Sequence, residues 1–222
     1  MSELGMPTNA AACQTAPKAN PLEVKSAPYT SPHMGTEMMF SWIKYPIILG
    51  SDVAGEVVEV CCAVTRFKVG DRVVGYAVGI DEKFNSSAKC AFQTYTVLLA
   101  HMASQIPSTL SYESAAVLPL GLSTAACGLF QKGHLALEYP SVTPKLTDKT
   151  LLIWGGSTSV GSNAIQLAVA AGYEVITTAS PRNFDYVKKL GASQVFDYNG
   201  KTIVDDLIHA FKGKKLAGVK LG

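Results

Sequence analysis

Residues 155–161 form the stretch of this sequence whose composition and spacing could do chemistry. The stretch reads GGSTSVG, with Gly156, Thr158 and Gly161 at the three marked positions of the dinucleotide-binding fingerprint. Glycine permits a sharp turn and close approach of the backbone to a ligand. A helix that starts at such a turn directs unpaired N–H groups and a partial positive charge at an anion. We therefore predict contacts with a diphosphate from Gly156, Ser157, Thr158, Ser159, Val160 and Gly161.

The segments on both sides of this stretch have the pattern of a βαβ unit. An apolar run at 151–154 leads into the glycines, and a helical pattern with an apolar face comes after them. Gly172 is placed to end that helix before a second apolar run at 174–179. This order is the context in which the fingerprint holds a dinucleotide. The alternative is a glycine-rich turn that has no ligand.

The end of the second predicted strand bears on the choice of dinucleotide. NAD-binding units place Asp or Glu there to accept hydrogen bonds from the ribose 2′-hydroxyl. This sequence has Ser180, Arg182 and Asn183 instead. A carboxylate would repel a 2′-phosphate, whereas arginine and hydroxyl groups bind it, so we predict NADPH as the cofactor. In a second interpretation, compatible with the first, Ser180 caps the next helix with Pro181 at its first position.

The composition restricts the class of protein. A chain of 222 residues suits one large or two small domains, and 48% hydrophobic residues can supply a core. A net charge of +2 with 16% charged residues does not indicate a nucleic-acid partner. No stretch reads as long and apolar enough to span a membrane, and residues 1–20 lack the hydrophobic core of a signal peptide. We expect a cytoplasmic protein.

The cysteines do not form a recognisable site. The five are at positions 13, 61, 62, 90 and 127, with no C-x-x-C pair, so neither a disulfide framework nor a four-cysteine zinc loop is predicted. Cys61 and Cys62 are expected to be free thiols in or near a turn. Nothing in the sequence groups a cysteine with a histidine, so a buried, inert thiol is the favoured interpretation over a nucleophile.

Elements outside the βαβ unit suggest a second kind of domain. Short alternating runs at 45–60, 67–75 and 91–97 predict strands of a small β-barrel. Ser111 can cap a helix over 112–117, and a second helix is predicted over 123–131. A proline-bearing linker lies at 139–144. The predicted division is a barrel domain with connecting helices at 1–146 and a dinucleotide-binding domain at 147–222.

The order of these motifs resembles the medium-chain dehydrogenase/reductases. The resemblance covers about residues 45–213, and the matching segments are 49–57 (LGSDVAGEV), 69–73 (VGDRV), 91–93 (AFQ), 118–120 (LPL), 124–125 (TA) and 151–199. It implies an α/β plus β fold, in which a GroES-like barrel precedes a Rossmann domain with a doubly wound parallel sheet. The most similar branch is that of fungal zinc-binding-dehydrogenase-domain proteins, which includes trans-acting enoyl reductases of secondary metabolism.

The resemblance also implies an activity. In zinc-free members, NADPH reduces the activated double bond of an enone or an acyl thioester, which a polyketide synthase can supply. Ser51 stands where zinc-dependent members have histidine, and serine is a poor zinc ligand, so no metal is predicted. Tyr198 matches a tyrosine near the adenosine ribose, and Thr124 a threonine near the nicotinamide. Each could equally be an ordinary strand-end aromatic or helix hydroxyl. We assign no catalytic residue, and expect a monomer or homodimer.

Two departures from the family pattern lead to an alternative. The segment 33–39 is too short for a strand and motif that relatives carry there, and the chain stops at Gly222 within the expected fourth Rossmann strand. We therefore expect an internally deleted and C-terminally truncated relative with only the first half of the Rossmann domain. The alternative to an active reductase is an inactive relative or gene-model fragment that retains partial nucleotide binding. The sequence does not identify the substrate or pathway.

Overall fold

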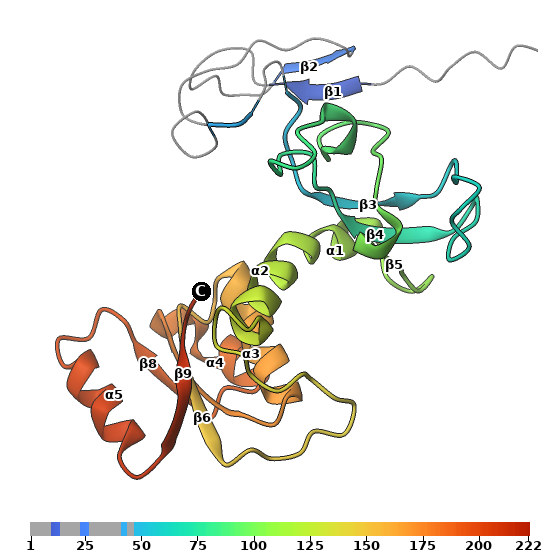
Figure 1. Cartoon of the computed structure of the whole chain (residues 1–222). Coiled ribbons are helices and arrows are strands. Elements are labelled where there is room, and N and C mark those ends of the chain that lie inside the picture. Colours follow the sequence, from blue (N-terminus) through green and yellow to red (C-terminus); the bar gives the residue numbers. More distant parts are fainter. Residues whose placement is uncertain (1–9, 14–22, 27–40, 44–46) are drawn as a thin grey trace, which may run out of the picture. The chain divides into compact units, whose positions relative to one another are not determined.

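The computed structural model describes residues 10–13, 23–26, 41–43 and 47–222 (Figure 1). The chain divides into two compact units, Met1–Leu120 and Gly121–Gly222, and each is described by itself. The division predicted from the sequence falls later, at residue 146, because no local pattern in residues 121–146 indicates that they pack with the parallel sheet of the second unit. The short segment 33–39 lies outside the described residues.

The first unit is built from antiparallel strands. β1 (Ala10–Cys13) pairs with β2 (Glu23–Ser26), and a separate sheet has the order β3 (Asp52–Glu56), β4 (Arg72–Tyr76), β5 (Ala103–Gln105). Alternation places Val73 and Gly75 of β4 in the interior, as expected for a strand with one buried face. Two short 3₁₀ helices, η1 (Ser87–Lys89) and η2 (Ala100–Met102), lie in the connection between β4 and β5.

The strand predicted over 91–97 is wrong. This segment is irregular, apart from a single bridge at Gln93, and its backbone N–H groups find scattered acceptors: Ala91 donates to Gly50, Phe92 to Leu49 and Val97 to Ala88. The Gln93 amide donates to the carbonyls of Ser87 and Cys90, each at 2.7 Å, and the Thr96 hydroxyl donates to Cys90 at 3.0 Å. Cys90 is fully buried, which raises the pKa of its thiol to about 11 and keeps it protonated. Cys61 and Cys62 are exposed free thiols beside a turn, as predicted.

Two consecutive helices end the first unit and begin the second. α1 (Tyr112–Ala116) starts where predicted, and its N-cap Ser111 accepts from the N–H of Ser114. α2 (Pro119–Phe130) starts four residues before the predicted position of 123. Proline suits the first position of a helix, and the N–H of Leu120 donates to Asp52 Oδ1 at 2.6 Å, so a carboxylate on β3 satisfies an otherwise unpaired donor.

The stretch Tyr112–Phe130 corrects one expectation from the sequence. With 19 residues and a mean hydropathy of 1.3, it has the length and composition of a membrane-spanning helix. However, Ala125 and Leu129 of α2 are fully excluded from solvent and belong to the core of the second unit. Burial in this core explains the apolar character of that face of α2, whereas Leu120 and Leu122 are 43% and 38% exposed.

The second unit is a parallel sheet with the strand order β8-β7-β6-β9. Its strands are β6 (Lys149–Trp154), β7 (Glu174–Ala179), β8 (Gln194–Asp197) and β9 (Lys215–Leu221). The connecting helices are α3 (Ser159–Ala170), α4 (Phe184–Lys189, preceded by the 3₁₀ turn η3, Pro181–Asn183) and α5 (Ile203–Phe211). The strand–helix alternation over 150–211 predicted from the sequence is confirmed.

The chain order places the switch point of the sheet at β6. The connections through α3 and α4 step outward to β7 and β8, whereas the connection through α5 returns to the other side of β6. Right-handed crossovers therefore place α5 on the opposite face from α3 and α4, as Figure 1 shows. The core between sheet and helices includes Leu151, Ile153, Ile165, Val175 and Val187, all at 0–1% exposure.

Candidate functional site

The glycine-rich turn joins the end of β6 to α3, and β7 holds it from one side. Gly155 has a φ of +85°, a conformation that glycine adopts without strain. Its N–H donates to the hydroxyl of Thr178 at 3.0 Å, and the N–H of Gly156 donates to the Thr178 carbonyl at 2.8 Å. The neighbouring hydroxyl of Thr177 donates to the carbonyl of Ile153 at 2.6 Å. Neither threonine was among the residues predicted for the site.

Two glycines of the turn are required by close packing. A β-carbon on Gly156 would overlap the hydroxyl oxygen of Thr177. A β-carbon on Gly161 would overlap the carbonyl oxygen of Gly155, which is backbone and cannot rotate away. The spacing of the fingerprint therefore has a steric cause here: the helix must start directly against the end of the strand.

The start of α3 presents backbone donors that the protein does not use. The Thr158 hydroxyl caps the helix by accepting from the N–H of Gly161 at 2.9 Å. Among the described residues, no acceptor is found for the N–H groups of Ser157, Ser159 and Val160. Three unpaired donors at a helix N-terminus fit the diphosphate of a dinucleotide. The Thr158 hydroxyl has its proton left for the predicted contact, because the cap uses only a lone pair.

A buried hydroxyl supports the turn from the helix side. Ser162, only 9% exposed, donates to the carbonyl of Gly156 at 3.2 Å. The same hydroxyl accepts from the phenol of Tyr186 on α4 at 3.1 Å. This chain of hydrogen bonds connects α4 to the turn. The sequence alone does not reveal these hydrogen bonds, because Ser162 and Tyr186 lie 24 residues apart in the chain.

The end of β7 brings the predicted adenosine-side residues to the turn. The amide Nδ2 of Asn183 donates to the hydroxyls of both Ser157 and Ser180, at 3.1 Å each. Ser180 occupies the N-cap position of η3 with Pro181 next, but its side chain makes no capping hydrogen bond. The capping interpretation of the Ser180 side chain is therefore wrong. Arg182 is exposed and has no hydrogen-bond or ion-pair partner among the described residues.

The other two predicted residues lie on separate elements. Tyr198 directly follows β8 and is 43% exposed. Since Thr177 pairs with Val195 and Ala179 with Asp197, Tyr198 and Ser180 follow strand ends at the same carboxyl edge of the sheet. Thr124 is an exposed residue of α2, three positions after Gly121, where a β-carbon would crowd the hydroxyl of Ser159. No hydrogen bond connects Tyr198 or Thr124 to the turn in the described part of the chain.

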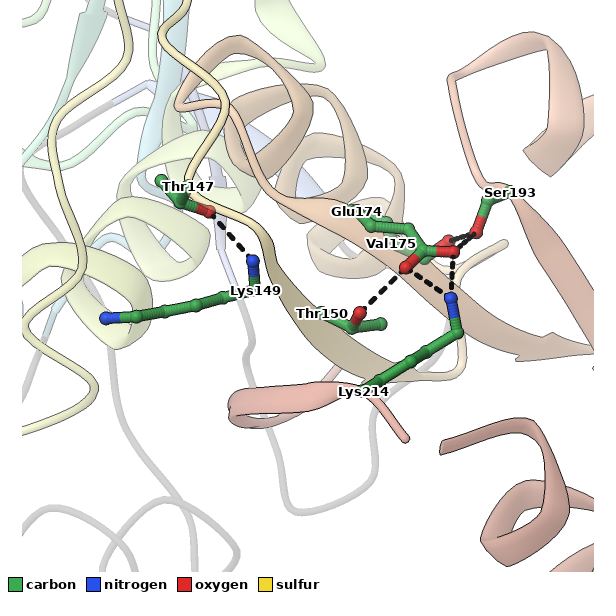
Figure 2. Close-up of polar contacts among 7 residues, drawn as sticks. All are labelled: Thr147, Lys149, Thr150, Glu174, Val175, Ser193 and Lys214. Carbon is green, nitrogen blue, oxygen red and sulfur yellow. Dashed lines mark hydrogen bonds and ion pairs between the residues drawn. The ribbon is translucent and has the colours of Figure 1, made fainter. Parts of the chain in front are cut away.

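A cavity of about 390 Å³ lies at the opposite, amino edge of this sheet, away from the turn. Its lining includes Glu174, whose carboxylate accepts from Lys214 at 2.6 and 2.8 Å, Thr150 at 2.7 Å and Ser193 at 3.0 Å (Figure 2). These groups connect the beginnings of all four strands. The hydrogen bonds from Lys214, together with the weaker effects of those from Thr150 and Ser193, hold the pKa of Glu174 below its usual 4.5. Because Thr150, Ser193 and Lys214 already donate hydrogen bonds to this carboxylate, we assign Glu174 a structural role.

The Glu174–Lys214 pair predicts a pH-dependent contribution to stability. Because the pKa of Glu174 is lowered in the folded state, the pair stabilises the fold above pH 4.5 and loses this effect as pH falls through the folded-state pKa. We expect Lys214→Met to lower the free energy of unfolding by about 1 kcal/mol near neutral pH, since 34% of the Glu174 side chain stays exposed.

Urea unfolding at neutral pH and at about pH 3 measures this effect. Lys215→Met is the matched control, because Lys215 also lines the cavity but has no ion pair among the described residues. An equal loss for the two variants, or a loss that grows as the pH falls, would contradict the assignment.

Comparison with known proteins identifies the family. The model of the alcohol dehydrogenase GroES-like domain matches residues 22–117, and that of the zinc-binding dehydrogenase domain matches residues 159–219. The chain belongs to the medium-chain dehydrogenase/reductases. The predicted fold class, a GroES-like domain followed by a Rossmann-type domain with a parallel sheet, is confirmed.

Individual relatives of the chain include fungal proteins. The chain is 56% identical to dehydrogenase pigH of Monascus ruber over 96% of its own length and 64% of that protein. It is 48% identical to trans-enoyl reductase himH of Aspergillus japonicus over 74% of its length and 47% of that protein. An alcohol dehydrogenase superfamily protein of Novosphingobium aromaticivorans superimposes with a TM-score of 0.69 at 28% identity, covering 91% of this chain and 62% of that one. The chain thus spans about half to two-thirds of the length of these relatives.

Proposed function

We propose that this dehydrogenase/reductase is an oxidoreductase that binds NADPH and reduces an activated carbon–carbon double bond. The observation that carries the proposal is the group of donors around the glycine-rich turn. Three backbone N–H groups at the start of α3 have no protein acceptor among the described residues, and Asn183 connects Ser157 of the turn with Ser180. Arg182 precedes Asn183 in the chain and is exposed. Backbone donors suit a diphosphate, and a guanidinium with hydroxyls suits a further phosphate.

The preference for NADPH rests on what the end of β7 lacks. Ser180, Pro181, Arg182 and Asn183 come directly after β7, so the carboxylate that would accept from a ribose 2′-hydroxyl is missing from this position. Arg182 has no internal partner that would neutralise it among the described residues. A 2′-phosphate would provide one.

The residues of the chain would bind and orient the cofactor and leave the hydride chemistry to it. When bound, NADPH supplies the hydride for the β-carbon of an enone or enoyl thioester, whose α-carbon then takes a proton. The turn would hold the diphosphate, and Tyr198 and Thr124 would contact the ribose and the nicotinamide side. The substrate class draws support from the name of the trans-enoyl reductase relative. A polyketide-synthase-bound acyl chain and a role in secondary metabolism are part of the same proposal.

Titration of the purified chain with NADPH and with NADH, followed by nucleotide fluorescence, tests the cofactor. We expect NADPH to bind at least about tenfold more tightly, which is the value of a single charge-assisted contact with the 2′-phosphate. Tighter binding of NADH would overturn the assignment. Consumption of NADPH with a simple enone then separates a reductase from the alternative, a relative that binds nucleotide without turnover.

We also propose that the chain works without zinc. Ser51 is 8% exposed, and serine stands where zinc-dependent members have histidine. The described residues contain no group of three or more His, Cys, Asp or Glu side chains that could hold a metal. Metal analysis of the protein purified without chelators is expected to give well below one zinc per chain. One tightly bound zinc per chain would contradict the proposal.

A further inference from the structure

We infer that Asn183 determines specificity for the 2′-phosphate by fixing the proton directions of two serine hydroxyls. This inference rests on the proposed NADPH site and explains how polar, uncharged side chains there distinguish a phosphate from a hydroxyl. The observation is that one amide nitrogen, Nδ2 of Asn183, donates to Ser157 on the glycine-rich turn and to Ser180 at the end of β7, each at 3.1 Å.

A serine hydroxyl has one proton to donate and two lone pairs that accept. Because Ser157 and Ser180 both accept from Asn183, each uses a lone pair on the amide and keeps its proton for another partner. In the described part of the chain, neither hydroxyl donates to a protein group. Both are half-buried and so stay within reach of a ligand. Two O–H donors directed away from Asn183 form a site for an acceptor-only group, and a phosphate is such a group.

The position of Asn183 is held independently of any ligand. Its backbone N–H donates to the carbonyl of Ser180 at 2.8 Å, which closes the turn η3. Arg182, adjacent in the chain, contributes the positive charge, and Asn183 contributes the orientation. An aspartate of the same shape at position 183 would reverse the arrangement. Its carboxylate would take the protons of both serines and would repel the phosphate.

The test uses the two nucleotide fragments that differ only in the 2′-phosphate, adenosine 2′,5′-bisphosphate and 5′-AMP, and measures binding by calorimetry with the full chain. For Asn183→Asp we expect roughly 100-fold weaker binding of the bisphosphate, with 5′-AMP changed by less than about threefold. Asn183→Ala removes the amide without adding a competing acceptor, so its loss for the bisphosphate should be only about threefold to tenfold.

Asn199→Asp is the control, because it makes the same isosteric change and the same change in charge at an exposed position of the second unit. It should leave the ratio of the two affinities within about threefold of the unmodified chain. A similar loss of affinity for both nucleotides in Asn183→Asp would mean that the residue only maintains the turn. Unchanged affinities for both nucleotides would mean that Asn183 does not contribute to recognition of the 2′-phosphate. Either result overturns the inference while leaving the cofactor site in place. Failure of the unmodified chain to bind either nucleotide would instead refute the proposed function, and the inference with it.

Discussion

Gly161→Ala is expected to lower the free energy of unfolding of the second unit by about 2–3 kcal/mol and to abolish measurable dinucleotide binding. The added β-carbon would overlap the carbonyl oxygen of Gly155 and approach the α-carbon of Gly156, which are both backbone atoms. Relief therefore requires α3 to move away from the end of β6. That movement would displace the N–H groups of Ser157, Ser159 and Val160, which we propose as the donors to the diphosphate.

Thermal unfolding with and without NADPH measures both effects. We expect the melting temperature of Gly161→Ala to fall by about 5–10 °C and not to rise when NADPH is added. Gly133→Ala is the control in the same unit, because a β-carbon there meets no atom within 4 Å and the backbone has no positive φ. Its melting temperature should stay within about 2 °C and should still rise with NADPH. If NADPH raised the melting temperature of Gly161→Ala as much as that of the unmodified chain, the cofactor site would not depend on the close approach of residue 161 to the carbonyl oxygen of Gly155.

The parts of the second unit whose conformation is determined by neighbouring residues in the sequence could be predicted. Glycines at fixed spacing, an apolar run before them and Gly172 at the end of a helix each have a conformational requirement that only certain residues meet. Each of these requirements can be recognised within a short segment of the sequence, without knowledge of the segments that pack against it. For this reason the strand, turn and helix order of the second unit agrees with the expectation from the sequence.

Features that depend on contacts between distant segments could not be predicted in this way. The segment 91–97 alternates like a strand, but the side chains of Gln93 and Thr96 satisfy carbonyls of the preceding loop instead. Thr177 and Thr178 read as ordinary β-branched strand residues, and only the folded turn reveals that their hydroxyls hold it. Likewise, the sequence leaves a capping role for the Ser180 side chain open, and the structure shows that this side chain accepts from Asn183 and makes no capping hydrogen bond.

Arg182→Glu is expected to weaken NADPH binding by at least about 100-fold, or about 3 kcal/mol, while NADH binding changes by less than about threefold. The guanidinium is exposed and has no competing acceptor among the described residues, so its hydrogen-bonding capacity is available to a ligand. Replacement by a carboxylate removes the attraction and adds repulsion with a group that carries close to two negative charges. NADH has no charge at the 2′ position, so its affinity should respond only to the screened field of the substituted residue.

Two comparisons make this result specific to the 2′-phosphate. Lys201→Glu changes the net charge equally at another exposed position of the same unit and should lower the two affinities to the same small extent. Arg182→Lys keeps the charge but loses the planar pair of donors, so its NADPH affinity should fall between those of the unmodified chain and Arg182→Glu. Equal losses of NADPH and NADH in Arg182→Glu would place the arginine near the diphosphate rather than the ribose. Arg182 would then strengthen dinucleotide binding in general, and the selection of NADPH would have to come from Ser157, Ser180 and Asn183 alone.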